Sequence, residues 1–158
     1  MPRGRQHIKK QIIKPDFKYN DMRIAKFINF LMKKGKKSLA EKIVYDALDI
    51  AAKKIDKKPL EVFEKAIDNA GPLLEVRSTR VGGATYQVPY EVVSSRRFTL
   101  ATRWIIESAL KKQGSPMSKF LAEEFMAAYN NEGTAVKNKL DTHKMAEANK
   151  AFAHFARF

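Results

Sequence analysis

The segment from Val76 to Val92 constrains the fold most, because it is the only part of the chain whose pattern is typical of β-structure. Residues of alternating character lead up to a Gly82-Gly83 pair. A second alternating run follows the pair: Tyr86, Val88, Tyr90 and Val92. Paired glycines between two such runs predict a hairpin turn, since the turn requires positive φ angles that glycine adopts without steric cost. Because Pro89 cannot donate a ladder hydrogen bond, we expect its strand to have a free edge.

Two loop lengths are compatible with this turn. A three-residue loop over residues 82–84 places Val76 opposite Tyr90, which keeps apolar side chains on one face. A two-residue loop sets Arg77 opposite Val88 and mixes the two faces. Because register normally follows the pattern of the faces, the sequence favours the longer loop.

The predicted hairpin and the residues after it are rich in arginine. The residues concerned are Arg77, Arg80, Arg96 and Arg97. A two-stranded ribbon alone is marginal in water, so the hairpin needs support from the helices or from a ligand. Either it packs on helices and leaves its arginines solvated, or it is a basic arm that reaches a polyanion. The rest of the chain decides between these alternatives.

The charge of the whole chain favours the polyanion. The chain of 158 residues contains 31 Lys and Arg and 17 Asp and Glu, which gives a net charge of +14. A chain of this length is expected to form one domain. Such charge indicates a nucleic acid or an anionic membrane surface as partner. Membrane is the weaker option, because no apolar run approaches a spanning length and no lipidation signal is present. The absence of cysteine fits a reducing compartment, so we expect a soluble cytoplasmic protein.

The chain divides into three segments. Residues 1–19 form a basic N-terminal arm without helical periodicity, expected to be disordered until it lies along phosphates. A merely solubilising tail is the alternative for this arm. Residues 20–149 form a helical domain that carries the hairpin at about 76–92, and residues 150–158 form a basic, aromatic C-terminal tail.

The helical domain is expected to be mainly α, with about six helices and the hairpin protruding between the third and the fourth. The first helix follows Asn20 or Asp21 as N-cap, and Ser38 with Glu41 forms a capping box for the second. Pro59 opens the third helix. The remaining signals are Gly71-Pro72 at the end of the third helix, Ser94 or Ser95 before the fourth, Ser115-Pro116 before the fifth and Thr134 before the sixth.

Lysines surround the turn between the first and second helices. They are Lys33, Lys34, Lys36 and Lys37. Such a turn is ordinarily a solvated corner, but the second helix also directs free N–H groups and its positive dipole end outward, which suits a phosphate. The corner is not a nucleotide P-loop, because Phe30 stands at the required upstream glycine position and Lys37 replaces the residue that would bind magnesium.

Catalytic and metal-binding patterns are absent from the sequence. The histidines His7, His143 and His154 are scattered, and no Asp or Cys cluster supplies metal-ligand spacing. There is no nucleophile elbow, no Gly-x-Gly-x-x-Gly and no zinc deaminase pattern. Trp104 fits a core anchor better than a base-stacking platform. We expect no enzyme, no cofactor and no small-molecule substrate.

Several motifs, in order, resemble the signature of the small-subunit ribosomal protein seven family in its bacterial form. These motifs are Phe27-Ile28, Gly35-Lys36-Lys37, Ile43-Val44, Ala47, Arg80 to Pro89, Arg103-Trp104-Ile105, Gly133 to Lys137 and Met145 to His154. The likeness covers essentially the whole chain, and ordered motifs are more specific than any one of them. Arg23 and Lys34 depart from the family pattern, and both add positive charge.

The resemblance implies a helical domain with a protruding β-hairpin, in a structural constituent of the small ribosomal subunit. Such a protein binds the 3′ major domain of small-subunit rRNA and initiates assembly of the head. It lies beside the exit-site tRNA and the outgoing mRNA, with the hairpin directed towards them and other ribosomal proteins as neighbours. Members of the family can also repress translation of their own operon message.

The distribution of charge agrees with this resemblance. RNA is recognised largely by shape and backbone, and a multi-helix junction offers phosphates from several strands, whereas a single-groove reader concentrates its charge on one helix. The candidate RNA-binding residues are Arg3, Arg5, Lys9, Lys10, Lys34, Lys36, Lys37, Arg77, Arg80, Gly82, Gly83, Arg96, Arg97 and Lys137. A DNA-binding helical protein and an RNA-modifying enzyme are the alternatives.

Overall fold

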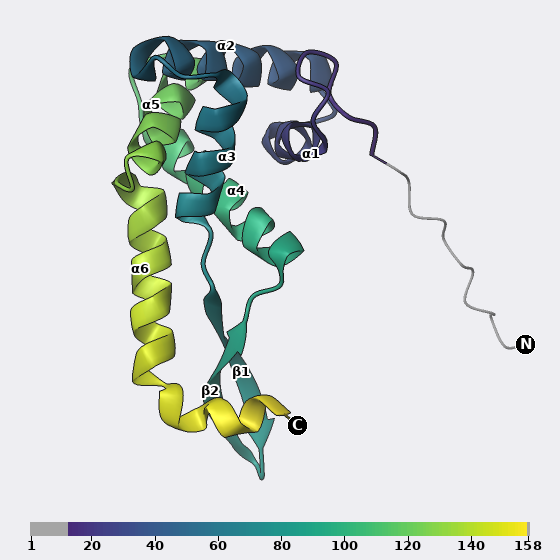
Figure 1. The fold of residues 1–158 in the computed structure, drawn as a ribbon. Coiled ribbons are helices and arrows are strands. Elements are labelled where there is room, and N and C mark those ends of the chain that lie inside the picture. The colour runs from purple at the N-terminus through teal and green to yellow at the C-terminus, as the bar shows by residue number, and fades with distance from the viewer. Residues whose placement is uncertain (1–12, 158) are drawn as a thin grey trace, which may run out of the picture.

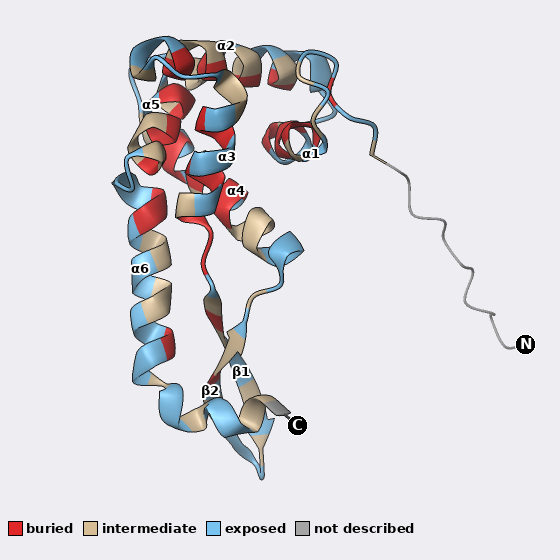
Figure 2. Ribbon diagram, viewed as in Figure 1, coloured by how far each residue is buried: buried red, intermediate tan, exposed pale blue. Residues whose placement is uncertain are grey.

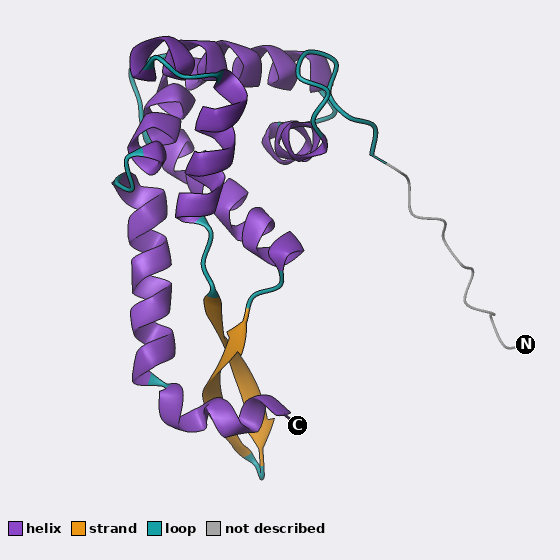
Figure 3. Ribbon diagram, in the orientation of Figure 1, coloured by secondary structure: helices purple, strands orange, loops and turns teal. Residues whose placement is uncertain are grey.

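The structure is a computed structural model that describes residues 13–157, so Arg3, Arg5, Lys9 and Lys10 of the expected arm lie outside it. Its elements are α1 (Met22–Leu31), α2 (Lys37–Ile55), α3 (Pro59–Ala70), β1 (Leu74–Val81), β2 (Ala84–Glu91), α4 (Ser94–Lys111), α5 (Met117–Tyr129), α6 (Gly133–Ala148) and the 3₁₀ helix η1 (Lys150–Arg157). The predicted mainly α fold, with a hairpin between the third and fourth helices, is confirmed (Figures 1 and 3).

The hydrophobic core lies inside the helical bundle and not under the hairpin, as the distribution of buried residues in Figure 2 shows. Three fully buried phenylalanines form its centre: Phe27 of α1, Phe63 of α3 and Phe125 of α5. Their ring centroids lie 5.4 to 6.0 Å apart. Since each ring comes from a different helix, this contact holds the bundle together. Trp104 is partly buried against the same core, as expected for an anchor.

Local signals placed several helix ends correctly. The Asp21 carboxylate caps α1 by accepting hydrogen bonds from the backbone N–H groups of Arg23 and Ile24, at 2.6 and 2.9 Å. Pro59 stands at the first position of α3, and Gly71 ends that helix. These residues act through their own backbone neighbours, so the sequence is enough to recognise them.

Three predicted caps are wrong by one residue or more. Ser38 lies inside α2, which starts at Lys37, Ser94 is the first residue of α4, and Thr134 lies inside α6. The first error has a backbone cause: Lys34 and Gly35 take left-handed φ angles of +51° and +73°, which turn the chain into α2 early. A left-handed lysine is uncommon, so a sequence pattern does not indicate it.

The expected three-residue hairpin loop is also wrong. Gly82 and Gly83 alone form the turn, with φ angles of +58° and +91°, so Val76 pairs with Pro89 and Arg77 with Val88. Two left-handed turn residues match the twist of the strands. Mixing the faces costs little here, because only Glu75 and Val88 are buried along both strands. The described sheet has two strands, so the free edge expected beside Pro89 is present.

The two ends of the described chain fold onto other elements. Before α1, the buried Asp16 carboxylate accepts hydrogen bonds from the N–H groups of Tyr19 and Asp21 and from the Tyr45 hydroxyl of α2. After α6, η1 crosses the hairpin, and the ring centroids of Phe152 and Phe155 lie 5.2 and 5.1 Å from that of Tyr86 (Figure 1). The aromatic tail therefore covers part of β2.

Candidate RNA interface

A buried carboxylate fixes the base of the hairpin. Glu75 of β1 is only 7% exposed, and it accepts hydrogen bonds from Arg77 Nε at 2.7 Å and from Arg96 Nε at 3.2 Å. Burial alone would raise the pKa of Glu75, but the hydrogen bonds and charges of the two arginines hold it below its ordinary value. Glu75 therefore stays ionised and ties the hairpin to the start of α4.

Arg77 and Arg96 keep donors for a further ligand. Their side chains are 56% and 42% exposed, and a guanidinium carries five N–H donors, more than the contacts with Glu75 use. The carboxylate holds both groups on one side of the hairpin base. The structure therefore brings together two residues that the sequence predicted separately as phosphate contacts.

Arg97 has a structural role that the sequence did not indicate. Its guanidinium donates to the Asp68 carbonyl at 2.9 Å and to the Gly71 carbonyl at 3.3 Å. Lys139 of α6 donates to the Asn69 carbonyl at 2.8 Å. Two cations thus bind the last carbonyl groups of α3, where they also face the negative end of its dipole. A phosphate contact from Arg97 would have to share these donors.

His143 continues this contact between α6 and the start of the hairpin. Its Nε2 accepts a hydrogen bond from the Leu73 backbone N–H at 2.9 Å, which requires a neutral ring. Burial, then the positive charges of Lys139 and Arg97, lower the pKa of His143. The sequence carried a signal for this face: Lys139 and His143 interrupt an otherwise apolar helical spacing between Val136 and Ala146.

Acidification is expected to weaken the fold through His143. The unfolded chain takes up this proton near the ordinary value of 6.5, whereas the folded chain resists it to a lower pH. The unfolded state therefore binds more protons in that window, and stability falls as the pH drops below about 6.5, by less than about 1 kcal/mol for a partly exposed ring. Urea unfolding at several pH values between 7 and 5 measures this loss.

The matched variant for this measurement is His143→Gln, which retains a hydrogen-bond acceptor but does not titrate. The lowered pKa values of Asp49 and Glu75 affect stability only at more acidic pH, below their ordinary values of 3.8 and 4.5. An equal loss of stability in both proteins between pH 7 and 5 would assign the effect to another group.

The predicted lysine corner lies between α1 and α2. Lys34, Lys36 and Lys37 are all exposed. Within the described residues no side-chain hydrogen bond caps α2, and the Lys37 N–H donates to the Gly35 carbonyl at 2.9 Å. Lys37 lies 4.0 Å from Glu41, an exposed pair of little strength. The corner therefore keeps exposed lysines beside the positive end of the α2 dipole, an arrangement that suits a phosphate.

The other predicted residues stand on separate elements. Arg80, Gly82 and Gly83 are exposed at the tip of the hairpin, which projects away from the bundle, and Lys137 is exposed on α6 (Figure 2). Within residues 13–156, no group of three His, Asp or Glu side chains is placed to hold a metal ion. None of the helices over this part of the chain is long and apolar enough to cross a membrane.

Comparison with known proteins gives a consistent result. The family model described as ribosomal protein S7p/S5e matches residues 3–150. The small ribosomal subunit protein uS7 of Chloroflexus aurantiacus is 56% identical over 157 residues, which cover 99% of each chain. That of Thermotoga neapolitana is 58% identical over 96% of this chain and 97% of its own. That of Roseiflexus sp. is 54% identical over the whole of both chains.

Proposed function

Because the chain belongs to the ribosomal protein S7p/S5e family, we propose that it binds the 3′ major domain of small-subunit rRNA and nucleates assembly of the head. It is a protein of the small ribosomal subunit, whose place is the ribosome in the cytoplasm. Its role is structural, and its partners are rRNA and neighbouring ribosomal proteins.

One observation carries this proposal: exposed cations stand on separate parts of the fold. They lie at the corner between α1 and α2, at the base and tip of the hairpin, and on α6. A folded RNA presents phosphates from several strands and is recognised through its backbone and shape. A protein that reads one groove of duplex DNA needs its cations on one recognition element instead.

The hairpin supports a finer proposal about position. It extends beyond the bundle and its tip is exposed (Figure 1). Its base is joined to α4 by the hydrogen bond from Arg96 to Glu75, and Phe152 of η1 packs against Tyr86 of β2. An arm of this kind is suited to reach ligands beside the rRNA site, and we assign it to the exit-site tRNA and the outgoing mRNA. Binding to the message of its own operon would use the same cations.

Competition between RNA and DNA tests the proposed function. The full chain is bound to a 3′-domain fragment of small-subunit rRNA, and duplex DNA is added at equal nucleotide concentration. We expect the rRNA to stay bound, because its folded shape positions phosphates for several elements at once. Equal displacement by DNA would reduce the function to that of a general polyanion binder.

Arg80→Ala is expected to weaken rRNA binding without changing stability. Arg80 is exposed, and within the described residues its guanidinium makes no hydrogen bond or ion pair, so truncation removes no polar contact from the folded state. Loss of one phosphate contact should lower the slope of log affinity against log salt by about 1. Arg77→Ala is less informative, because it also removes a hydrogen bond to Glu75.

The control for Arg80→Ala is Arg103→Ala, which removes the same charge from an exposed position on α4. Salt titrations of binding and thermal unfolding are measured for both variants. If both weaken binding equally, net charge explains the loss and the hairpin tip makes no specific contact.

A further inference from the structure

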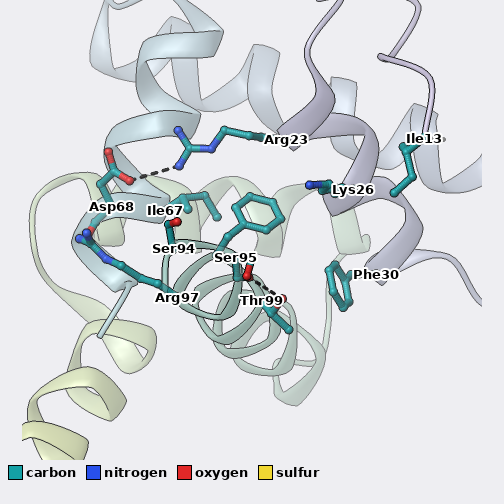
Figure 4. Close-up of a pocket in the computed structure, with 11 residues that line it drawn as sticks. Ile13, Arg23, Lys26, Phe30, Ile67, Asp68, Ser94, Ser95, Arg97 and Thr99 are labelled. Carbon is teal, nitrogen blue, oxygen red and sulfur yellow. Dashed lines mark hydrogen bonds and ion pairs between the residues drawn. The ribbon is translucent and has the colours of Figure 1, made fainter. Parts of the chain in front are cut away.

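A pocket beside the predicted phosphate contacts is not explained by backbone recognition. It has a volume of about 680 Å³, within the range of about 300–1,000 Å³ that ligand pockets occupy. Three helices line this open pocket: α1 on one side, the end of α3 on another and the first turns of α4 below, and Ile13 of the segment before α1 also lines it (Figure 4). None of the candidate residues named from the sequence, except Arg97, lines it.

Two aromatic rings form apolar walls of this pocket. Phe30 of α1 is 40% exposed, although the opposite side of the same helix is buried in the core. Phe98 of α4 packs partly against the core and leaves its remaining surface in the pocket. The guanidinium carbon of Arg23 lies 5.8 Å from the Phe98 ring centroid, in the range of a cation–π contact. Flat apolar surfaces and a guanidinium plane are the groups on which unpaired bases stack.

The rim of the pocket is positively charged. Arg23, Lys26 and Arg97 supply three cations, and Asp68 supplies one carboxylate, which leaves a net charge of +2. Arg23 pairs with Asp68 at 3.2 Å, and Arg97 is bound to the end of α3. Lys26 is exposed, and over residues 13–156 its ammonium group makes no hydrogen bond or ion pair (Figure 4). Lys26 therefore remains available for a phosphate.

Polar groups complete the chemistry of a nucleotide site. The hydroxyl groups of Ser94 and Ser95 line the pocket, and within the described chain neither makes a side-chain hydrogen bond. These two hydroxyl groups can form hydrogen bonds with the edge of a base. The Thr99 hydroxyl, in contrast, already donates a hydrogen bond to the Ser95 carbonyl at 2.9 Å. Stacking walls, a free cation and unused hydroxyl groups thus meet in one cavity.

We infer that the pocket between α1 and α4 holds one unpaired nucleotide of RNA, with its base against Phe30 and Phe98 and its phosphate near Lys26. This inference rests on the proposed RNA-binding function. A base within a duplex cannot enter, because its faces are covered by neighbouring pairs. The pocket therefore selects a bulged or single-stranded position, whereas the exposed arginines and lysines contact backbone.

The test uses the full chain with two RNA probes, a six-nucleotide unpaired oligoribonucleotide of mixed sequence and a duplex RNA, alongside the rRNA fragment. Phe30→Ala is expected to weaken binding of the unpaired probe about 5- to 150-fold, equivalent to one lost stack, and to leave duplex binding unchanged. Phe30→Tyr keeps a stacking ring and should bind like the parent protein. Phe17→Ala removes an exposed phenylalanine outside the pocket and serves as the control.

The outcomes separate this inference from the proposed function. If the parent protein binds the rRNA fragment tightly and Phe30→Ala binds the unpaired probe equally well, the inference is wrong and the function stands. That result would favour an apolar side chain of a neighbouring protein as the occupant of the pocket. If Phe30→Ala weakens both probes equally, general damage to the RNA interface is the cause and the inference is also wrong. If the parent protein fails to bind the rRNA fragment, both proposals fail.

Discussion

Raising the salt concentration from about 50 to 200 mM is expected to weaken binding of the rRNA fragment by roughly 10³ to 10⁵. Each cation that neutralises a phosphate releases a condensed counterion. The entropy gained by this release becomes smaller as the salt concentration of the solution rises, so the affinity falls. A fall of this size corresponds to about six to ten phosphate contacts. The candidate residues that are exposed in the described chain are similar in number: Lys34, Lys36, Lys37, Arg77, Arg80, Arg96 and Lys137.

The measurement is equilibrium binding at four or more salt concentrations, plotted as log affinity against log salt. The competitor DNA is titrated in the same way, because non-specific binding is almost purely electrostatic and should show no residual affinity at high salt. A change below tenfold over this range would mean one or two phosphate contacts. Such a result would contradict recognition by several elements.

The sequence predicted those parts of the fold that depend on neighbouring residues. Asp21, Pro59 and Gly71 mark helix ends through their own backbone geometry, and paired glycines mark the hairpin turn. Hairpin register was predicted wrongly because it was inferred from a buried face, and in this hairpin only Glu75 and Val88 are buried along the two strands. Where burial does not choose the register, turn geometry does.

The site was harder to predict, since its contacts join residues far apart in the chain. Arg96 reaches Glu75 across 21 positions, and Lys139 reaches the Asn69 carbonyl across 70. Composition identified the cations, but their distribution between structural contacts and exposed positions depends on how α3, α4 and α6 pack. The nucleotide pocket has the same origin, because Phe30 gave no signal beyond an apolar residue at a helix end.

Phe125→Ala is expected to lower the free energy of unfolding by about 3–5 kcal/mol. Phe125 is fully buried, and its ring lies 5.4 Å from that of Phe27 and 6.0 Å from that of Phe63, between centroids. Truncation removes the transfer free energy of the ring and leaves a cavity that three helices must close. Since small domains are stable by only about 5–15 kcal/mol, the loss is a large fraction of the total.

Urea unfolding measures this loss, and Phe17→Ala, at a fully exposed phenylalanine, should change stability by less than about 0.5 kcal/mol. Equal effects of the two variants would mean that the three rings do not form the centre of the core. Binding gives the complementary result. Phe125 is fully buried in the core, whereas the candidate RNA-binding residues of the described chain are exposed or half-buried, so below its unfolding temperature the variant should bind rRNA like the parent protein. The core would then act on RNA binding only by keeping α3 and α4 folded, since these two helices hold the hairpin and the pocket in place.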